Sequence, residues 1–272
     1  LRSYTQVNLP DSMALVGLYN ATGGSSWTNH TNWLAANKPV SEWEGVVVSG
    51  DRVVSVSLIN NNLIGTIPAA IGDVNALTIL DLSGNTLSGG IPATINSLTL
   101  LESLNLSSNN FIGTVPLLNN LTNLSFCELY DNSLSGAVPD FSGNLLLFYL
   151  DLSFNVLNGA IAGLSVSNTP DLYYIDLSEN NLSGNIPVSL AALTKLETIN
   201  LNKNQITGTI PASLSNLTDL SWLALSNNLL TGSIPATFNT LDNLATLALE
   251  HNQLTGGIPA GLSNIQGLSN LT

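Results

Sequence analysis

The sequence has little charge and few basic residues. Of its 272 residues, 8% are charged, against about 25% in a typical globular domain. Five Lys and Arg stand against 18 Asp and Glu, which gives a formal net charge of −13. So acidic a chain is repelled by the phosphates of nucleic acids and by the headgroups of an anionic membrane. We therefore expect no nucleic-acid partner, whereas basic and neutral partners remain open.

Cysteine and long apolar runs are also scarce. Cys127 is the only cysteine, so an intrachain disulfide is excluded, and we expect its side chain to pack as a small hydrophobe. No run of about 18 consecutive apolar residues occurs, so we expect no membrane insertion. The chain begins at Leu1 rather than Met, which favours a shortened chain or a mature product that has lost its signal peptide.

Groups that could carry out chemistry are few. The two histidines, His30 and His251, lie near opposite ends of the chain, and no Ser-His-Asp or Cys-His arrangement can be drawn around them. The sequence has no metal-spaced Cys/His cluster and no glycine-rich phosphate loop. We expect no enzyme, no cofactor and no resident metal.

What the sequence does contain is one pattern, which occurs nine times from Val53 onward. The frame is L-x-x-L-x-L-x-x-N-x-L-x-G-x-I-P, as in "LTILDLSGNTLSGGIP" and "LYYIDLSENNLSGNIP". Its L-x-L segment is a short strand whose leucines point to one side, and stacked copies can bury them in one column beside a parallel sheet. The inward asparagine can satisfy backbone groups that the next turn leaves unpaired. The frame asparagines are Asn61, Asn85, Asn109, Asn132, Asn155, Asn180, Asn204, Asn228 and Asn252.

Over residues 53–272 this frame resembles the plant-type subclass of the leucine-rich repeat family. The resemblance implies an α/β solenoid: a right-handed superhelix with a concave parallel β-sheet and short 3₁₀ or extended segments on the convex side. Nine full repeats and a partial tenth are expected, with Ala162 in place of one frame proline. The tenth repeat stops at Thr272, which favours truncation and leaves an uncapped coil open to end-to-end contact.

Residues 1–52 lack the frame and are expected to cap the solenoid within one continuous domain. The stretch "PDSMALVGLYNATGG" predicts a short helix with Asp11 as its N-cap, ended by Gly23 and Gly24. Met13, Val16 and Tyr19 are expected to share its apolar face.

A tryptophan-rich loop follows this helix. Its segment "SEWEGVVV" resembles the N-terminal cap of plant-type members without the disulfide, since Ser41 and Val48 stand where the family has cysteines. We expect the three tryptophans of the region to belong to the core of the cap rather than to a ligand site: Trp27, Trp33 and Trp43.

Function should lie on the strand positions that the frame leaves free. The position before the first strand leucine is aromatic in four of nine repeats, and three of these are consecutive. The position between the leucines is acidic in three adjacent repeats, at about 5 Å spacing. Tyr173 is expected only to flank its strand. The residues expected to contact a partner on the concave face are Phe126, Glu128, Tyr130, Tyr149, Asp151, Tyr174, Asp176, Glu179 and Trp222.

The acidic column also has an interpretation without function. L-D-L-S is a common strand sequence in the family, so these aspartates can be ordinary repeat residues. A Ca²⁺ site at Glu128, Asp151 and Asp176 is disfavoured, since one carboxylate per strand on an open face makes a poor cage. An aromatic and acidic face instead suits a basic peptide or a sugar.

The preferred hypothesis is an extracellular recognition module, secreted or on the cell surface, that binds a protein, peptide or glycan without catalysis. One alternative is an ice-binding protein that uses rows of Thr and Ser at the turn side, among them Thr207, Thr209, Thr231 and Thr255. Another is a structural or adhesive element of an extracellular assembly. Possible N-glycosylation sequons occur at Asn20, Asn29, Asn105, Asn120, Asn123, Asn181, Asn216 and Asn270.

Overall fold

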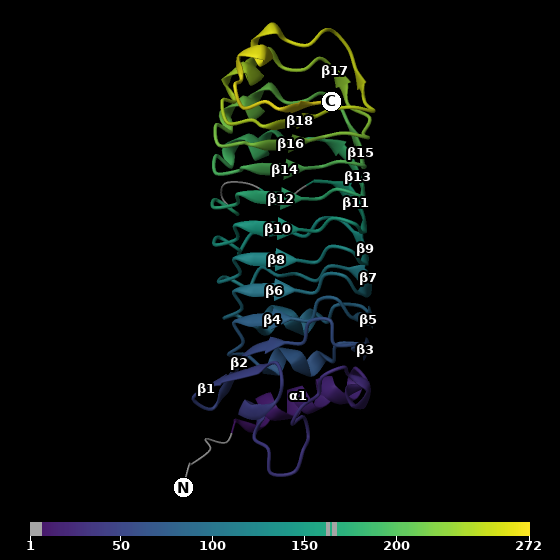
Figure 1. The fold of residues 1–272 in the computed structure, drawn as a ribbon, viewed down its shortest axis with the longest axis vertical. Helices are drawn as coiled ribbons and strands as arrows, with labels where there is room; N and C mark the ends of the chain where they lie inside the picture. Colours follow the sequence, from purple (N-terminus) through teal and green to yellow (C-terminus); the bar gives the residue numbers. More distant parts are fainter. Residues whose placement is uncertain (1–6, 162–163, 165–167) are drawn as a thin grey trace.

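The chain is a solenoid of stacked coils that runs from helix α1 (Leu9–Ala21) at one end to the last strands at the other (Figure 1). The structure, a computed structural model, describes residues 7–161, 164 and 168–272. Ala162, the predicted departure from the frame proline, lies outside the described residues. The predicted α/β solenoid is confirmed.

One long sheet follows the whole length of the solenoid. It has eleven strands, and every pairing in it is parallel except β1 with β2. Each L-x-L segment of the frame supplies one strand, so successive coils add successive neighbours. The strands are β1 (Val46–Ser49), β2 (Arg52–Ser57), β4 (Ile79–Asp81), β6 (Ser103–Asn105), β8 (Phe126–Glu128), β10 (Tyr149–Asp151), β12 (Tyr174–Asp176), β14 (Thr198–Asn200), β16 (Trp222–Ala224), β18 (Thr246–Ala248) and β20 (Asn270–Leu271).

A second set of short parallel strands lies at the x-G-x turns, along the right-hand edge in Figure 1. Seven strands form one sheet: β3 (Ile64–Gly65), β5 (Thr86–Gly89), β7 (Asn110–Thr114), β9 (Ser133–Gly136), β11 (Val156–Ala160), β13 (Asn181–Asn185) and β15 (Gln205–Thr207). Two more strands pair with each other: β17 (Thr231–Gly232) and β19 (Gln253–Leu254).

Short 3₁₀ helices follow many of the frame prolines, as the resemblance implied. They are η3 (Ala69–Asp73), η4 (Ala93–Ser97), η5 (Val188–Ala192), η6 (Ala212–Asn216), η7 (Ala236–Thr240) and η8 (Ala260–Asn264). Two more lie in the N-terminal region: η1 (Gly24–Ser26) and η2 (Val40–Glu42). Proline suits this place because its fixed φ sets the start of the turn and it needs no hydrogen-bond partner for its nitrogen.

The frame asparagines form a ladder through the coils. Asn155 is typical: its Nδ2 donates to the carbonyls of Leu129, Leu152 and Ser153, and its Oδ1 accepts from Leu134 N at 2.9 Å. Each asparagine thus joins its own turn to the coil before it, which is the role predicted for these residues. The ladder begins in the N-terminal region, because Asn61 donates to the carbonyl of Asn29 at 2.8 Å.

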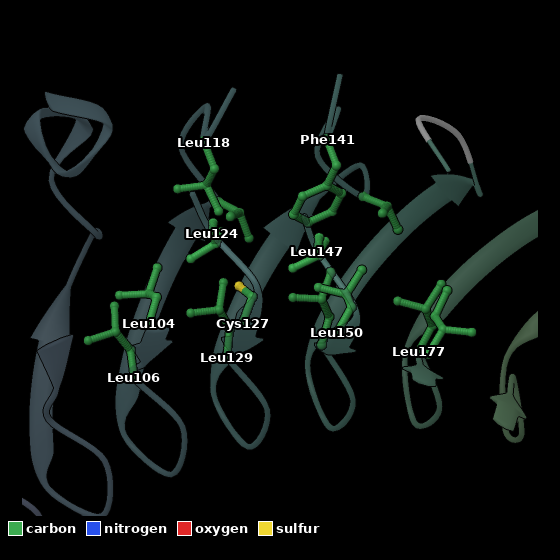
Figure 2. Close-up of a cluster of buried hydrophobic side chains, with 14 of the residues drawn as sticks. Leu104, Leu106, Leu118, Leu124, Cys127, Leu129, Phe141, Leu147, Leu150 and Leu177 are labelled. Atoms are coloured by element: carbon green, nitrogen blue, oxygen red, sulfur yellow. The ribbon is translucent and has the colours of Figure 1, made fainter. Parts of the chain in front are cut away.

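Cys127 takes a leucine position of the core. It is fully buried on β8 among Leu104, Leu124 and Leu150, as Figure 2 shows. Burial is the main reason that the pKa of its thiol rises to about 12, so the side chain stays protonated and packs as an apolar group. The prediction of a small core hydrophobe is confirmed.

Two predictions about helix α1 were wrong. The N-cap is Asn8, whose Oδ1 accepts from Asp11 N at 3.0 Å. The buried apolar residues of the helix are Ala14, Leu15 and Leu18. Val16 and Tyr19 are partly buried against the core as expected, but Met13 does not share their face and is 63% exposed. Packing of the helix on the first coil, and not its own apolar periodicity, decides which face is covered.

Asp11 instead connects the helix to the sheet. Its carboxylate is completely buried and accepts two hydrogen bonds of 3.0 Å from the Arg52 guanidinium and one of 2.8 Å from Val53 N. Such a paired, hydrogen-bonded charge tolerates burial, whereas an unpaired one would not. The carboxylate raises the pKa of Arg52, although burial opposes this effect.

The three N-terminal tryptophans are buried, as predicted. Trp33 contacts both others, with ring centroids 4.9 Å from Trp27 and 4.7 Å from Trp43. The indole nitrogens of Trp27 and Trp33 donate to the carbonyls of Thr22 and Glu44. The cluster therefore serves packing, and its rings are not available to a ligand.

Candidate functional site

Three aromatic rings form a continuous stack on the open face of the long sheet. They occupy the same position on β8, β10 and β12, because Tyr149 pairs in register with Phe126 on one side and Tyr174 on the other. The ring centroids are 4.6 Å apart between Phe126 and Tyr149 and 4.2 Å between Tyr149 and Tyr174, with nearly parallel planes. The parallel register brings these predicted site residues together, because it stacks like positions of successive repeats.

Trp222 occupies the same column but lies apart from this stack. Thr198 on β14 separates it from Tyr174, and the indole is 43% exposed. The small threonine leaves a hollow of about 330 Å³. It is lined by Tyr174, Asp176, Thr198, Asn200, Ser221 and Trp222. The face therefore offers a ridge of three rings, a gap, and a fourth ring beyond it.

The second column places three carboxylates side by side: Glu128, Asp151 and Asp176. An asparagine closes each end of the row, since Asn105 donates to Glu128 Oε2 at 2.6 Å and Asn200 to Asp176 Oδ2 at 2.7 Å. Asp151 and Asp176 are 8% and 9% exposed, and each accepts from the backbone and hydroxyl of the serine two residues on. The two aspartates are thus more deeply set than an open face suggests.

Burial and nearby negative charge favour the protonated forms of Glu128 and Asp151. Burial, followed by the charges of Asp151 and Asp81, raises the pKa of Glu128 to about 7. Burial also raises the pKa of Asp151 to about 6, against the opposing hydrogen bonds from Ser153. The same causes raise the pKa of Tyr149 to about 12 and raise that of Tyr174. A nearby positive charge would relieve this repulsion.

Among the described residues, the basic side chains are engaged elsewhere. Lys195 pairs with Asp171 at 2.5 Å, Lys203 pairs with Glu179, and Arg52 pairs with Asp11. Lys38 pairs with Glu42. The row of three carboxylates therefore has no cation of its own within the part of the chain that the structure describes. In that part, no group of three or more His, Cys, Asp or Glu is arranged to hold a metal ion.

Two aromatic residues of this face were not anticipated from the sequence. Phe148 and Tyr173 stack with centroids 5.6 Å apart, and Tyr173 also contacts Tyr149 and Tyr174 edge-on. Tyr173 therefore belongs to the aromatic cluster and does not only flank its strand. The available signal was that both residues occupy one frame position in adjacent repeats.

The remaining predicted residues lie where the strands end. Tyr130 is half-buried just after β8, and Glu179 pairs with Lys203, so this carboxylate is already neutralised. Beside them Phe154 is 54% exposed and has a positive φ of 52°. The residue before each frame asparagine has this left-handed conformation, but only here is it a large apolar side chain.

The Thr and Ser rows lie on the other strand set, away from the aromatic cluster. Thr207, Thr231 and Thr255 are exposed, and the hydroxyl of each donates to a glycine carbonyl of the preceding coil at 3.2 Å. These bonds fix the side-chain rotamers in three successive repeats. Exposed Ile64, Ile112 and Asn158 interrupt the rows nearer the N-terminus.

Comparison with known proteins identifies the family. The family model described as "Leucine rich repeat" matches residues 51–111, 170–230 and 194–254, and a further model of the same description matches residues 100–124. These matches cover more than half of the chain, which therefore belongs to the leucine-rich repeat family. Its likeness to plant receptors makes it a plant-type member.

Two plant receptor structures resemble the chain. One is the plant peptide hormone receptor RGFR1 in complex with RGF2, at 37% identity and a TM-score of 0.73 over 80% of this chain. Another is the ectodomain of the receptor kinase GASSHO1/SCHENGEN3 from Arabidopsis thaliana in complex with CASPARIAN STRIP INTEGRITY FACTOR 2, at 30% identity and a TM-score of 0.83 over 95% of this chain. The chain covers 34% of each of these two proteins, so it spans about a third of their length.

A third structure has nearly the same extent as this chain. It is a plant ice-binding protein, at 27% identity and a TM-score of 0.75, and the match covers 97% of this chain and 95% of that one. Within the described residues, none of the helices has the length and apolar character needed to cross a bilayer.

Proposed function

We propose that this protein is an extracellular, non-catalytic recognition module that binds a peptide or a peptide segment of a protein on the open face of its long sheet. The carrying observation is the stack of Phe126, Tyr149 and Tyr174 beside a row of carboxylates that has no cation among the described residues. Aromatic rings on a rigid sheet bind with little loss of side-chain entropy, and charged hydrogen-bond acceptors next to them add specificity.

The comparisons support a peptide over a glycan. The structure of the plant peptide hormone receptor RGFR1 contains RGF2. The structure of the GASSHO1/SCHENGEN3 ectodomain contains CASPARIAN STRIP INTEGRITY FACTOR 2. Ligand binding on ectodomains of this family also supports an extracellular place and a non-catalytic role. Residues 1–52 would serve as the N-terminal cap, and residues 53–272 would form the binding solenoid.

Selection from a displayed library of random twelve-residue peptides tests this proposal. Enriched peptides should bind the wild-type protein and lose at least tenfold in affinity for Tyr174→Ala, because the stack is then broken. Thr255→Ala, directly after β19 at the turn side, is the matched control and should bind normally. Peptides that bind both variants equally, or a library that yields no binder, would contradict the proposal.

A second candidate function is ice binding by the exposed Thr and Ser rows. Two observations favour it: the plant ice-binding protein matches nearly end to end, and the hydroxyls of Thr207 and Thr231 are held in fixed positions. Thr207→Tyr with Thr231→Tyr should abolish ice-crystal shaping if this function is right, and Tyr174→Ala should leave it intact. Wild-type protein that does not shape ice rules this function out.

A further inference from the structure

We propose that the hollow between Tyr174 and Trp222 is a subsite for an arginine side chain of the bound peptide. The inference rests on the proposed function and names the chemistry of one ligand residue. It starts from a difference between two neighbouring regions of the same column: the rings of β8, β10 and β12 stack on one another, whereas those of β12 and β16 leave a gap above Thr198.

The width of the gap suits one flat group. Tyr174 and Trp222 stand two strands apart, which corresponds to about 9.6 Å. A flat group in van der Waals contact with both rings needs about 7–8 Å. The remaining space allows the rings to tilt, and a volume of about 330 Å³ leaves room for the aliphatic stem.

The floor of the hollow selects for positive charge. Asp176 Oδ1 already accepts from Ser178 N and Oγ, and Oδ2 accepts from Asn200 Nδ2. A carboxylate has about four acceptor positions, so one on Oδ2 remains for a ligand. Asp151 lies on the next strand, and neither carboxylate has a described cation beside it.

Arginine fits these features better than lysine. Its guanidinium is planar, so it can lie between two rings while its in-plane N–H groups reach the carboxylate. A lysine ammonium could reach Asp176 but would leave one ring face uncovered. A neutral planar group would fill the gap but leave the acidic row uncompensated.

A titration with small probes tests the subsite independently of any peptide. N-acetyl-arginine amide and N-acetyl-citrulline amide have nearly the same shape, but only the first is charged. Added to the ¹⁵N-labelled full chain, the arginine probe should shift the indole N–H signal of Trp222 in a saturable way. The citrulline probe should bind at least fivefold more weakly. Trp222→Phe assigns the signal.

Two matched variants locate the charge. Asp176→Asn should weaken the arginine probe at least fivefold. Asp81→Asn should leave it unchanged, although Asp81 holds the same column position and makes the same contacts with its own serine, Ser83. Thr198→Phe should abolish the shift by filling the hollow. Thermal unfolding of each variant shows whether the fold is kept.

Equal binding of both probes, or equal loss in Asp176→Asn and Asp81→Asn, would overturn the arginine subsite. The outcome is separable from the proposed function. If selected peptides need Tyr174 but show no preference for arginine, the proposed recognition face stands and the arginine subsite is wrong. If the arginine probe binds as expected but the library selection yields no peptide, the subsite stands and the peptide-binding function is wrong.

Discussion

The rings of Tyr149 and Tyr174 lie almost parallel, with 3° between their planes and 4.2 Å between their centroids. Tyr149 also stacks on Phe126, so it is the middle ring of the ridge. A middle ring holds its neighbours in place, and central aromatic residues dominate the energy of many interfaces.

Replacing Tyr149 should therefore distinguish the contribution of ring stacking to peptide affinity from that of the hydroxyl group. We expect Tyr149→Ala to weaken selected peptides at least tenfold, whereas Tyr149→Phe keeps the stack and stays within about threefold of wild type. Isothermal titration of both variants measures the difference. Equal affinity of the Ala variant and the wild type would exclude the ridge from the binding face.

The asparagine ladder predicts a position-dependent loss of stability. Asn155→Ala leaves buried backbone groups without partners and should lower the free energy of unfolding by about 3 kcal/mol. Asn252→Ala should cost about 1 kcal/mol, because Asn252 is only half-buried and its contact with the Glu250 carbonyl is long, at 3.5 Å. Urea unfolding followed by circular dichroism provides both values, and a reversed order would argue against the ladder as the main restraint.

The raised pKa of Glu128 predicts that stability falls as pH rises. Its folded pKa of about 7 lies above the usual 4.5, so the folded chain keeps a proton that the unfolded chain has released. This contribution is fully present below pH 4.5 and is lost as the pH passes 7. The groups that face Glu128 are the carboxylates of Asp81 and Asp151 and the side chains of Asn105 and Tyr149.

Glu128→Gln is the test of this pH dependence. Between pH 5 and 7, the free energy of unfolding of the variant should fall less steeply with pH than that of the wild type. At pH 8 the variant should be the more stable protein. Asp151 titrates with the same sign but near pH 6, so a residual slope at lower pH is expected. Identical pH profiles of the two proteins would show that Glu128 is ionised normally.

The left-handed backbone at Phe154 predicts that glycine is more stable than alanine at this position. Its left-handed φ of 52° is unfavourable for a bulky residue and free of cost for glycine, which occupies the matching position at Gly84. Phe154→Gly should be about 1 kcal/mol more stable than Phe154→Ala, since both remove the ring and only one relieves the backbone. Thermal or urea unfolding of the pair isolates the effect, and a more stable Ala variant would contradict it.

We predict that the thiol of Cys127 reacts only after the chain unfolds. The side chain is 0% exposed and its pKa is about 12, so neither access nor thiolate is available in the folded chain. A chromogenic disulfide reagent should therefore label no thiol at pH 8 in buffer and one per chain in denaturant. Rapid labelling of the folded protein would mean that β8 opens locally.

The repeat frame determined the fold and much of the site. Frame leucines and asparagines recur at fixed positions, so strand order, register and the aromatic column could be read directly from like positions. The stack of Phe126, Tyr149 and Tyr174 follows from parallel register alone.

What the sequence did not reveal depends on contacts outside the frame. Asp11 looked like a helix cap because its partner Arg52 is 41 residues away, and no local signal links them. Glu179 was predicted to be available to a partner, but it forms an ion pair with Lys203 on the next coil. The hollow beside Trp222 depends on Thr198 being small, a feature that matters only once the rings on both sides are known.

The regular strand spacing of the long sheet also sets how many residues of an extended bound peptide span the site. From Phe126 on β8 to Trp222 on β16 there are four strand intervals, or about 19 Å. An extended peptide that crosses the strands advances about 3.3 Å per residue, so about six residues reach from the first ring to the last. An arginine in the gap then lies about three to five residues from the position opposite Phe126, so the footprint has a defined length and a defined spacing between its two anchor residues.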